Sequence, residues 1–144
     1  MAKIIERSAL VAFSAQQMFD LVNDIECYPQ FLPGCVGAKV LQQSDAEIEA
    51  RLELEKGNFS QSFVTRNQLT APHSIVMHLV DGPFKKLEGR WTFSPISDQG
   101  CKVHLKLEFE FKNKLMALAA GHWFETVANQ LVDSVCQRAQ SLYA

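Results

Sequence analysis

The stretch from Asn113 to Leu142 constrains this sequence most, because its pattern predicts one long amphipathic helix. Apolar residues recur there at spacings of three, four and seven, the period of a single helical face. They are Met116, Ala120, Trp123, Val127, Leu131, Val135 and Leu142. At about 1.5 Å per residue such a helix is roughly 40 Å long, enough to cross a small domain. Another layer of structure must cover its apolar face.

The upstream residues alternate between apolar and polar side chains, which predicts strands. The expected strands are 3–12, 36–42, 47–55, 59–67, 75–80, 84–93 and 102–112. Short turns separate them, so we expect a meander of six to seven antiparallel strands. Asp81 and Gly82 predict a tight hairpin, and Gly89 in mid-strand predicts a bulge or bend that lets the sheet curl. The fold class is therefore α+β, a curved antiparallel sheet wrapped around the C-terminal helix.

One short helix is expected after the first strand. Ser14 and Gln17 match the capping-box pattern, which predicts a helix from Ala15 to about Val22 or Asn23.

The segment 23–34 is unusually apolar for a loop. It contains Pro29, Pro33 and Gly34, which predict a loop with one helical turn starting at Pro29. Four large apolar residues also fall within it, namely Ile25, Tyr28, Phe31 and Leu32. Loops of this composition pack down as a lid or contact a partner, and ordinary structural packing is the alternative.

Length and composition predict one globular domain spanning 1–144. The chain is 47% hydrophobic and 21% charged, without a linker, a repeat or an apolar run long enough to cross a bilayer. Charged residues near the N-terminus argue against a signal peptide, so we expect a cytoplasmic protein. Its four cysteines lie far apart and no histidine stands at metal-site spacing, which predicts free thiols and no metal site.

Charge is unevenly distributed along the chain. The net charge of −2 argues against sequence-blind binding to nucleic acid. Residues 45–56 carry five acids and two bases, whereas residues 85–114 carry seven bases and four acids. Solvated strand faces of mixed charge are one explanation, and a basic surface for a partner is the other.

Several stretches together resemble the StAR-related helix-grip proteins. They are VNDIE at 22–26, YPQFLPGC at 28–35, TRNQL at 65–69, LVDGPFKKL at 79–87 and LEFEFKNKL at 107–115. Within that superfamily the match is to the group that joins the coenzyme Q-binding proteins with the ribosome association toxin RatA. Gly34 stands where a Trp is common in the coenzyme Q members, which places the sequence nearer the RatA branch.

The resemblance implies a helix-grip (START-like) fold with a hydrophobic cavity between sheet and helix, reached past the loop around Tyr28. It implies two functions. One is that of a toxin–antitoxin protein that binds the large ribosomal subunit and opposes subunit association. The other is ubiquinone binding in support of cellular respiration, without a ribosomal role. A ubiquinone-class lipid is the expected cavity ligand, and no resident cofactor is expected.

The candidate cavity and lid residues are apolar or aromatic side chains on the sheet, on the C-terminal helix and in the loop 25–33. They are Ile25, Tyr28, Phe31, Leu32, Phe63, Met77, Trp91, Leu107, Phe109, Trp123 and Val127. They could line a pocket for a quinone ring or an isoprenoid. A filled core would produce the same pattern, because any sheet packed on a helix needs inward aromatic side chains.

The candidate partner-binding patch consists of cations on two strands expected to pair, with Arg90 and Lys106 on their outward faces. They are Lys85, Lys86, Arg90, Lys102 and Lys106. A phosphate-rich surface such as the ribosome would offset their mutual repulsion, and acidic neighbours such as Glu88 or Glu108 would do so too.

Enzyme chemistry has little support in the sequence. It contains no nucleophile elbow, phosphate-binding loop or H-E-x-x-H motif, so we expect a non-catalytic protein. A cyclase-type enzyme using Tyr28, His78 or Arg66 as acid or base is the remaining alternative.

Overall fold

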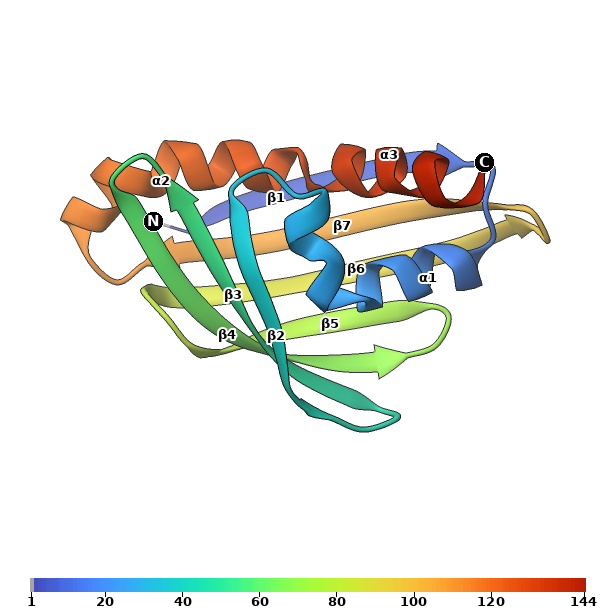
Figure 1. Cartoon of the computed structure of the whole chain (residues 1–144), viewed down its shortest axis with the longest axis horizontal. Coiled ribbons are helices and arrows are strands. Elements are labelled where there is room, and N and C mark those ends of the chain that lie inside the picture. The colour runs from blue at the N-terminus through green and yellow to red at the C-terminus, as the bar shows by residue number, and fades with distance from the viewer. Residues whose placement is uncertain (1) are drawn as a thin grey trace.

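The computed structural model describes residues 2–144 as a curved antiparallel sheet that holds two C-terminal helices, the helix-grip arrangement (Figure 1). The strands are β1 (Lys3–Val11), β2 (Cys35–Gln43), β3 (Glu47–Lys56), β4 (Phe59–Thr70), β5 (Ser74–Asp81), β6 (Phe84–Ser97) and β7 (Gly100–Phe111). The helices are α1 (Ala15–Asn23), the 3-10 helix η1 (Ile25–Gln30), α2 (Lys114–Asn129) and α3 (Leu131–Tyr143). The predicted fold class is confirmed.

Strands β2 to β7 form a meander, and β1 is added at its far edge beside β7. The order of the sheet is β1-β7-β6-β5-β4-β3-β2, so the first strand pairs with the last. Two register irregularities, between Cys35 and Gly37 and between Val40 and Gln42, bend the edge strand β2. In Figure 1, β2, β3 and β4 cross β6 and β7 at a steep angle, so the sheet wraps around the space beneath α2 and α3.

The predicted single C-terminal helix is two helices in the structure. Asn113 caps α2, because its Oδ1 accepts hydrogen bonds from the backbone N–H of Leu115 at 2.7 Å and of Met116 at 3.4 Å. The helix ends after Asn129, and the N–H of Gln130 bonds back to the carbonyls of Thr126 and Val127. The expectation of an unbroken helix was therefore wrong, although α3 continues along the same side of the sheet (Figure 1).

The buried face of the two C-terminal helices is not the predicted stripe. The fully buried positions are Ala120, Phe124, Ala128, Val132, Val135 and Ala139. The predicted stripe shares only Ala120 and Val135 with them, and Leu142 is 51% exposed. Side chains of the predicted stripe at Trp123, Val127 and Leu131 are half-buried. The buried positions keep spacings of three or four residues across Gln130. From Phe124 to Val132 the buried face therefore lies one residue beyond the predicted stripe, and this offset begins before the break.

The short helix α1 begins and ends as predicted. Ser14 Oγ accepts a hydrogen bond from Gln17 N at 3.1 Å, and Gln17 Oε1 accepts one from Ser14 N at 2.9 Å. The next helical turn does not start at Pro29. It is η1, which begins at Ile25, because the buried Ile25 side chain anchors the turn immediately after α1.

Two details expected of β5 and β6 differ in the structure. Of the bulge or bend expected at Gly89, the bulge is absent, because Gly89 pairs in regular register with Met77 and with Leu107. A Cβ at Gly89 would collide with the Met77 methyl group, so glycine serves close packing there. The hairpin at Asp81 and Gly82 is not tight, since pairing between β5 and β6 stops at His78 and Glu88.

The core has two main clusters at opposite ends of the sheet. One gathers the rings of Phe63, Phe84, Phe109 and Phe124, with Phe109 and Phe124 centroids 4.7 Å apart. The other packs α1 residues such as Met18 and Phe19 against Phe93, Val132 and Val135. The space between these clusters holds the candidate site.

Candidate functional site: an apolar cavity under the C-terminal helices

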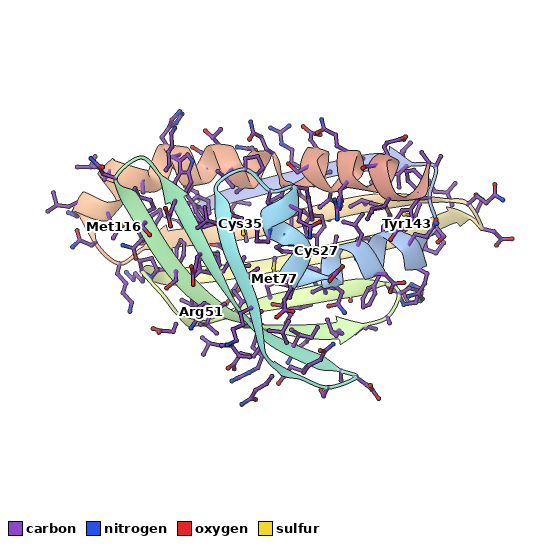
Figure 2. All side chains as sticks on the ribbon, in the orientation of Figure 1. Cys27, Cys35, Arg51, Met77, Met116 and Tyr143 are labelled. Atoms are coloured by element: carbon purple, nitrogen blue, oxygen red, sulfur yellow. The ribbon has the colours of Figure 1, made fainter. Side chains whose placement is uncertain are left out.

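A cavity of about 100 Å³ lies between the sheet and the two C-terminal helices. Its wall comes from η1 and the loop after it, from β2 to β7 and from α2 and α3. Figure 2 shows Cys35 of β2 and Met77 of β5 near the middle of the molecule, where the β2 arm crosses the sheet. The wall is overwhelmingly apolar, which suits an apolar ligand.

Small side chains keep this region hollow. Ala50 of β3 and Ala128 of α2 are 1% and 2% exposed, and both belong to the wall. The bulky aromatic rings pack at one end of the sheet and α1 closes the other. A short side chain at each of these two positions removes the atoms that would fill the centre.

The structure brings most of the predicted cavity residues together. The wall includes Ile25, Tyr28, Leu32, Phe63, Met77, Trp91, Leu107 and Val127. The alternation along each strand correctly assigned their faces, and the apolar segment after α1 packs as a cover.

Three predicted residues lie elsewhere. Phe109 is turned into the ring cluster around Phe124. Trp123 packs edge-on against Phe59, with ring centroids 5.4 Å apart, beside a separate shallow pocket. Phe31 lies against Tyr28, with Arg138 Cζ 5.4 Å from its ring centroid. Helical phase and cluster packing decide these positions, and neither is visible in a linear pattern.

Sequence reasoning missed the remaining wall residues. They are Pro33, Cys35, Ala50, Leu52, Leu54, Thr65, Asn67, Leu87, Phe124, Ala128, Leu131 and Val135. The period of two that begins at Phe63 extends through Thr65 to Asn67, so alternation could have identified both polar residues. Their polar character hid them from a search for apolar side chains.

The segment over the cavity is tied down at three points. The Tyr28 hydroxyl donates a hydrogen bond to the Val22 carbonyl. Glu26 Oε2 accepts one from the Val40 backbone N–H at 3.0 Å. Arg138 of α3 donates one to Gln30 Oε1 at 2.8 Å. In the structure η1 therefore covers the cavity as a closed lid.

The cavity wall carries no group that acts as a base near neutral pH. In residues 2–144 the wall includes no carboxylate, histidine, lysine or arginine. Burial raises the pKa of the Tyr28 hydroxyl, with further contributions from Cys35 and Asp24. Burial also raises the pKa of the Cys35 thiol, so both groups stay protonated.

Two residues considered for cyclase chemistry lie outside the cavity. His78 and Arg66 face each other in the β4–β5 register, and both are exposed. Arg66 forms ion pairs with Glu49 at 2.8 Å and with Glu47 at 3.7 Å. Of the three candidates only Tyr28 lies on the wall.

The predicted basic patch divides into two parts. Lys85 and Lys86 have acidic partners, with Nζ 3.9 Å from Glu110 and 3.2 Å from Glu108 respectively. Arg90 and Lys106 lie directly opposite each other across β6 and β7. Within residues 2–144, neither of these two cations nor Lys102 forms an ion pair. The nearby Glu6 instead contacts His104 at 2.7 Å.

Residues 2–144 contain neither a metal-binding cluster nor a helix that could span a membrane. From Ala2 to the C-terminus, no three His, Cys, Asp or Glu side chains gather as a metal site would require. No helix in the same range has the length and hydrophobicity needed to span a membrane. The four cysteines are free, as the sequence predicts.

Comparison with known families gives one match covering most of the chain. Residues 11–136 match the family described as polyketide cyclase / dehydrase and lipid transport. The chain is 48% identical to the ribosome association toxin RatA of Escherichia coli K12 over 140 residues, 97% of this chain and 89% of that protein. It is 50% identical to RatA of Vibrio cholerae over 141 residues, 98% of each.

A more distant relative carries a different name. The chain is 31% identical to the mitochondrial coenzyme Q-binding protein COQ10 homolog B of Xenopus laevis over 140 residues, which is 94% of this chain and 57% of that protein.

Solved structures resemble the fold closely. A START superfamily protein from Mycobacterium smegmatis superposes with a TM-score of 0.76 at 25% identity, covering 96% of this chain and 98% of that one. The Zhui aromatase/cyclase from Streptomyces sp. R1128 superposes with a TM-score of 0.80 at 16% identity, covering 97% and 94%. At that identity the second likeness concerns the fold alone.

Proposed function

Because the chain belongs to the polyketide cyclase / dehydrase and lipid transport family and is RatA-like over almost its whole length, we propose that it binds the large ribosomal subunit and opposes subunit association. We further propose that its cavity holds ubiquinone or a similar lipid. One observation carries the ribosomal part of this proposal. The chain is 48–50% identical to proteins named for ribosome association, and the alignments cover 97–98% of it.

The outer face of the sheet supplies a chemically suitable contact. Arg90 and Lys106 are exposed and lie side by side without an acidic partner among the described residues. Like charges in this arrangement repel each other slightly, and a phosphate group between them would relieve the repulsion. Ribosomal RNA presents such groups across its surface.

Sucrose-gradient analysis tests the ribosomal part. Purified protein is added to separated subunits, magnesium is raised to drive association, and the ribosome peak is measured. We expect the associated peak to fall as protein is added and the protein to sediment with the large subunit. Unchanged association together with protein that stays at the top of the gradient would contradict the proposal.

The alternative is a ubiquinone-binding chaperone for respiration with no ribosomal role. The apolar wall and the 31% identity to a coenzyme Q-binding protein favour it. Native mass spectrometry of the protein purified from its own cells, followed by extraction of bound lipid, tests the cavity directly. A stoichiometric quinone without ribosomal binding would favour this alternative over the first proposal.

We also propose that the protein acts without catalysis. A cyclase needs an acid or base aimed at its substrate, and the cavity wall offers only a tyrosine and a cysteine whose pKa values burial raises. His78 and Arg66, the other candidates, are exposed. This lack of a base at the wall supports a binding role.

A further inference from the structure

Two neighbouring polar side chains interrupt the apolar wall. Thr65 and Asn67 of β4 are 7% and 6% exposed, and both line the cavity. They stand two residues apart, so they share the inner face of the strand with Phe63. Buried polar groups usually have hydrogen-bond partners, and an unpaired one costs free energy.

The pair satisfies only part of its hydrogen-bonding capacity. Thr65 Oγ1 donates to Asn67 Oδ1 at 3.0 Å, which fixes the orientation of the Asn67 amide. The amide nitrogen, Nδ2, carries two hydrogens and donates neither to any residue in 2–144. Asn23 Oδ1 is the one fully enclosed, unpartnered side-chain oxygen or nitrogen in that range. Asn67 Nδ2 is therefore not fully enclosed, and Asn67 is one of the residues that line the cavity.

Other donors on the wall are mostly engaged. The Tyr28 hydroxyl donates to the Val22 carbonyl. The Cys35 thiol donates to the Gly37 carbonyl at 3.5 Å. The indole N–H of Trp91 remains as a second donor, two strands away from Asn67. The wall thus presents unpaired N–H groups and no charged group, a surface that selects neutral ligands with acceptor oxygens.

Cavity size limits what can bind there. A water molecule needs roughly 10–15 Å³ of such space, so about 100 Å³ accommodates roughly eight non-hydrogen atoms. That is the size of one six-membered ring bearing two carbonyl oxygens. Methyl groups on the ring and a long tail would have to extend toward the lid, so a tetramethyl ring binds only as the lid segment moves outward.

We propose that Asn67 Nδ2, held in position by Thr65, donates a hydrogen bond to a carbonyl oxygen on the ring of the cavity ligand. This inference rests on the proposed function, because it assumes that the cavity takes up a lipid, and it adds the recognition element. The ligand class is a neutral carbonyl-bearing ring, such as a quinone head group. Thr65 is a positioning residue and Asn67 contacts the ligand.

The test compares two rings that differ in their oxygens. Duroquinone carries four methyl groups and two carbonyl oxygens, and full methylation prevents it from adding to thiols such as Cys35. Durene has the same four methyl groups on a ring without oxygens. Affinities of both for the full-length protein are measured by equilibrium partitioning. We expect wild type to bind duroquinone more tightly than durene.

Two variants test whether the Asn67 amide recognises the carbonyl oxygen of the ligand. Asn67→Leu keeps a similar shape but removes the donor, and we expect duroquinone binding to weaken about 3- to 10-fold, the range of one neutral hydrogen bond. Durene binding should stay the same or improve. Thr65→Val leaves the amide in place but frees its orientation, so duroquinone binding should weaken less. This second variant preserves the shape of the side chain and guards against a folding defect in the first.

The outcomes separate this inference from the proposed function. If both rings bind wild type but Asn67→Leu weakens them equally or not at all, the role of Asn67 is overturned and the lipid cavity stands. If neither ring binds wild type, the inference and the lipid part of the proposed function are both overturned. Selective loss of duroquinone binding in Asn67→Leu supports the proposal.

Discussion

At the scale of single residues, backbone conformation and burial decide which side chain a position tolerates. Gly34 has a φ of +80° and a Cβ there would lie 2.8 Å from Trp123 Cζ2. Tyr28 sits where burial penalises its charged form. Each residue therefore allows a prediction about stability.

Gly34→Ala should reduce the free energy of unfolding by about 2–3 kcal/mol, because it combines a positive φ with a collision against Trp123. Gly57→Ala is the matched control. Its φ is +57° and nothing lies within 4 Å of the added carbon, so it carries only the backbone cost of about 1 kcal/mol. Urea unfolding of both variants measures the difference. Equal losses would mean that Trp123 moves aside freely.

Tyr28 predicts a loss of stability at alkaline pH. Its pKa in the folded protein lies above the ordinary value of 10.0, so its stabilising contribution is complete below pH 10 and is lost as pH rises through the folded value. Tyr28→Phe removes this dependence and a hydrogen bond to Val22, costing about 1 kcal/mol at pH 7. Urea midpoints from pH 8 to 11.5 should therefore fall less steeply in the variant. Parallel curves would refute the prediction.

At the scale of elements, η1 and α3 act together although they are far apart in sequence. Arg138 contacts Gln30 through a hydrogen bond and Phe31 through its ring face. The connection spans 108 residues of sequence. Both contacts are at the surface, so we expect them to affect local opening of the lid more than global stability.

Arg138→Ala should speed hydrogen exchange in residues 25–33 several-fold while lowering global stability by no more than about 1 kcal/mol. Arg7→Ala is the control, because Arg7 Nε donates an exposed hydrogen bond to Asn129 at 3.1 Å without touching the lid. Hydrogen-exchange mass spectrometry distinguishes the two. Equal protection of the lid in both variants would show that Arg138 does not hold it closed.

At the scale of the whole molecule, the two proposed functions occupy opposite faces of one sheet. The cavity faces the helices, whereas Arg90 and Lys106 face solvent. Successive side chains of a strand point to opposite faces of the sheet, so the exposed Arg90 is followed directly by the buried Trp91. Substitutions on one face can therefore be tested for their effect on the other.

Arg90→Gln with Lys106→Gln should weaken large-subunit binding about tenfold or more and reduce its dependence on salt, since two phosphate contacts would be lost. Lys85→Gln with Lys86→Gln removes the same charge from sites already paired with Glu110 and Glu108, so its effect should be smaller. Co-sedimentation at several salt concentrations measures both. Equal effects would mean that only total charge matters. Duroquinone binding serves as the folding control for both variants.

The sequence by itself determined the elements whose signals are local. Strand faces follow from a period of two, and α1 follows from the capping box at Ser14 and Gln17. These patterns placed Met77, Trp91 and Leu107 on the inner face of the sheet, where they are found.

Only the tertiary structure decided what lies between sheet and helices. The hollow depends on Ala50 and Ala128, which come from distant segments and both line the cavity. Phe109 packs into the aromatic cluster and does not lie on the wall. Pairing of Lys86 with Glu108 was likewise settled by strand register. Cavities and ion pairs are set by distances between residues far apart in the chain, whereas helical and strand periods are set by neighbours, and only the latter can be read along a sequence.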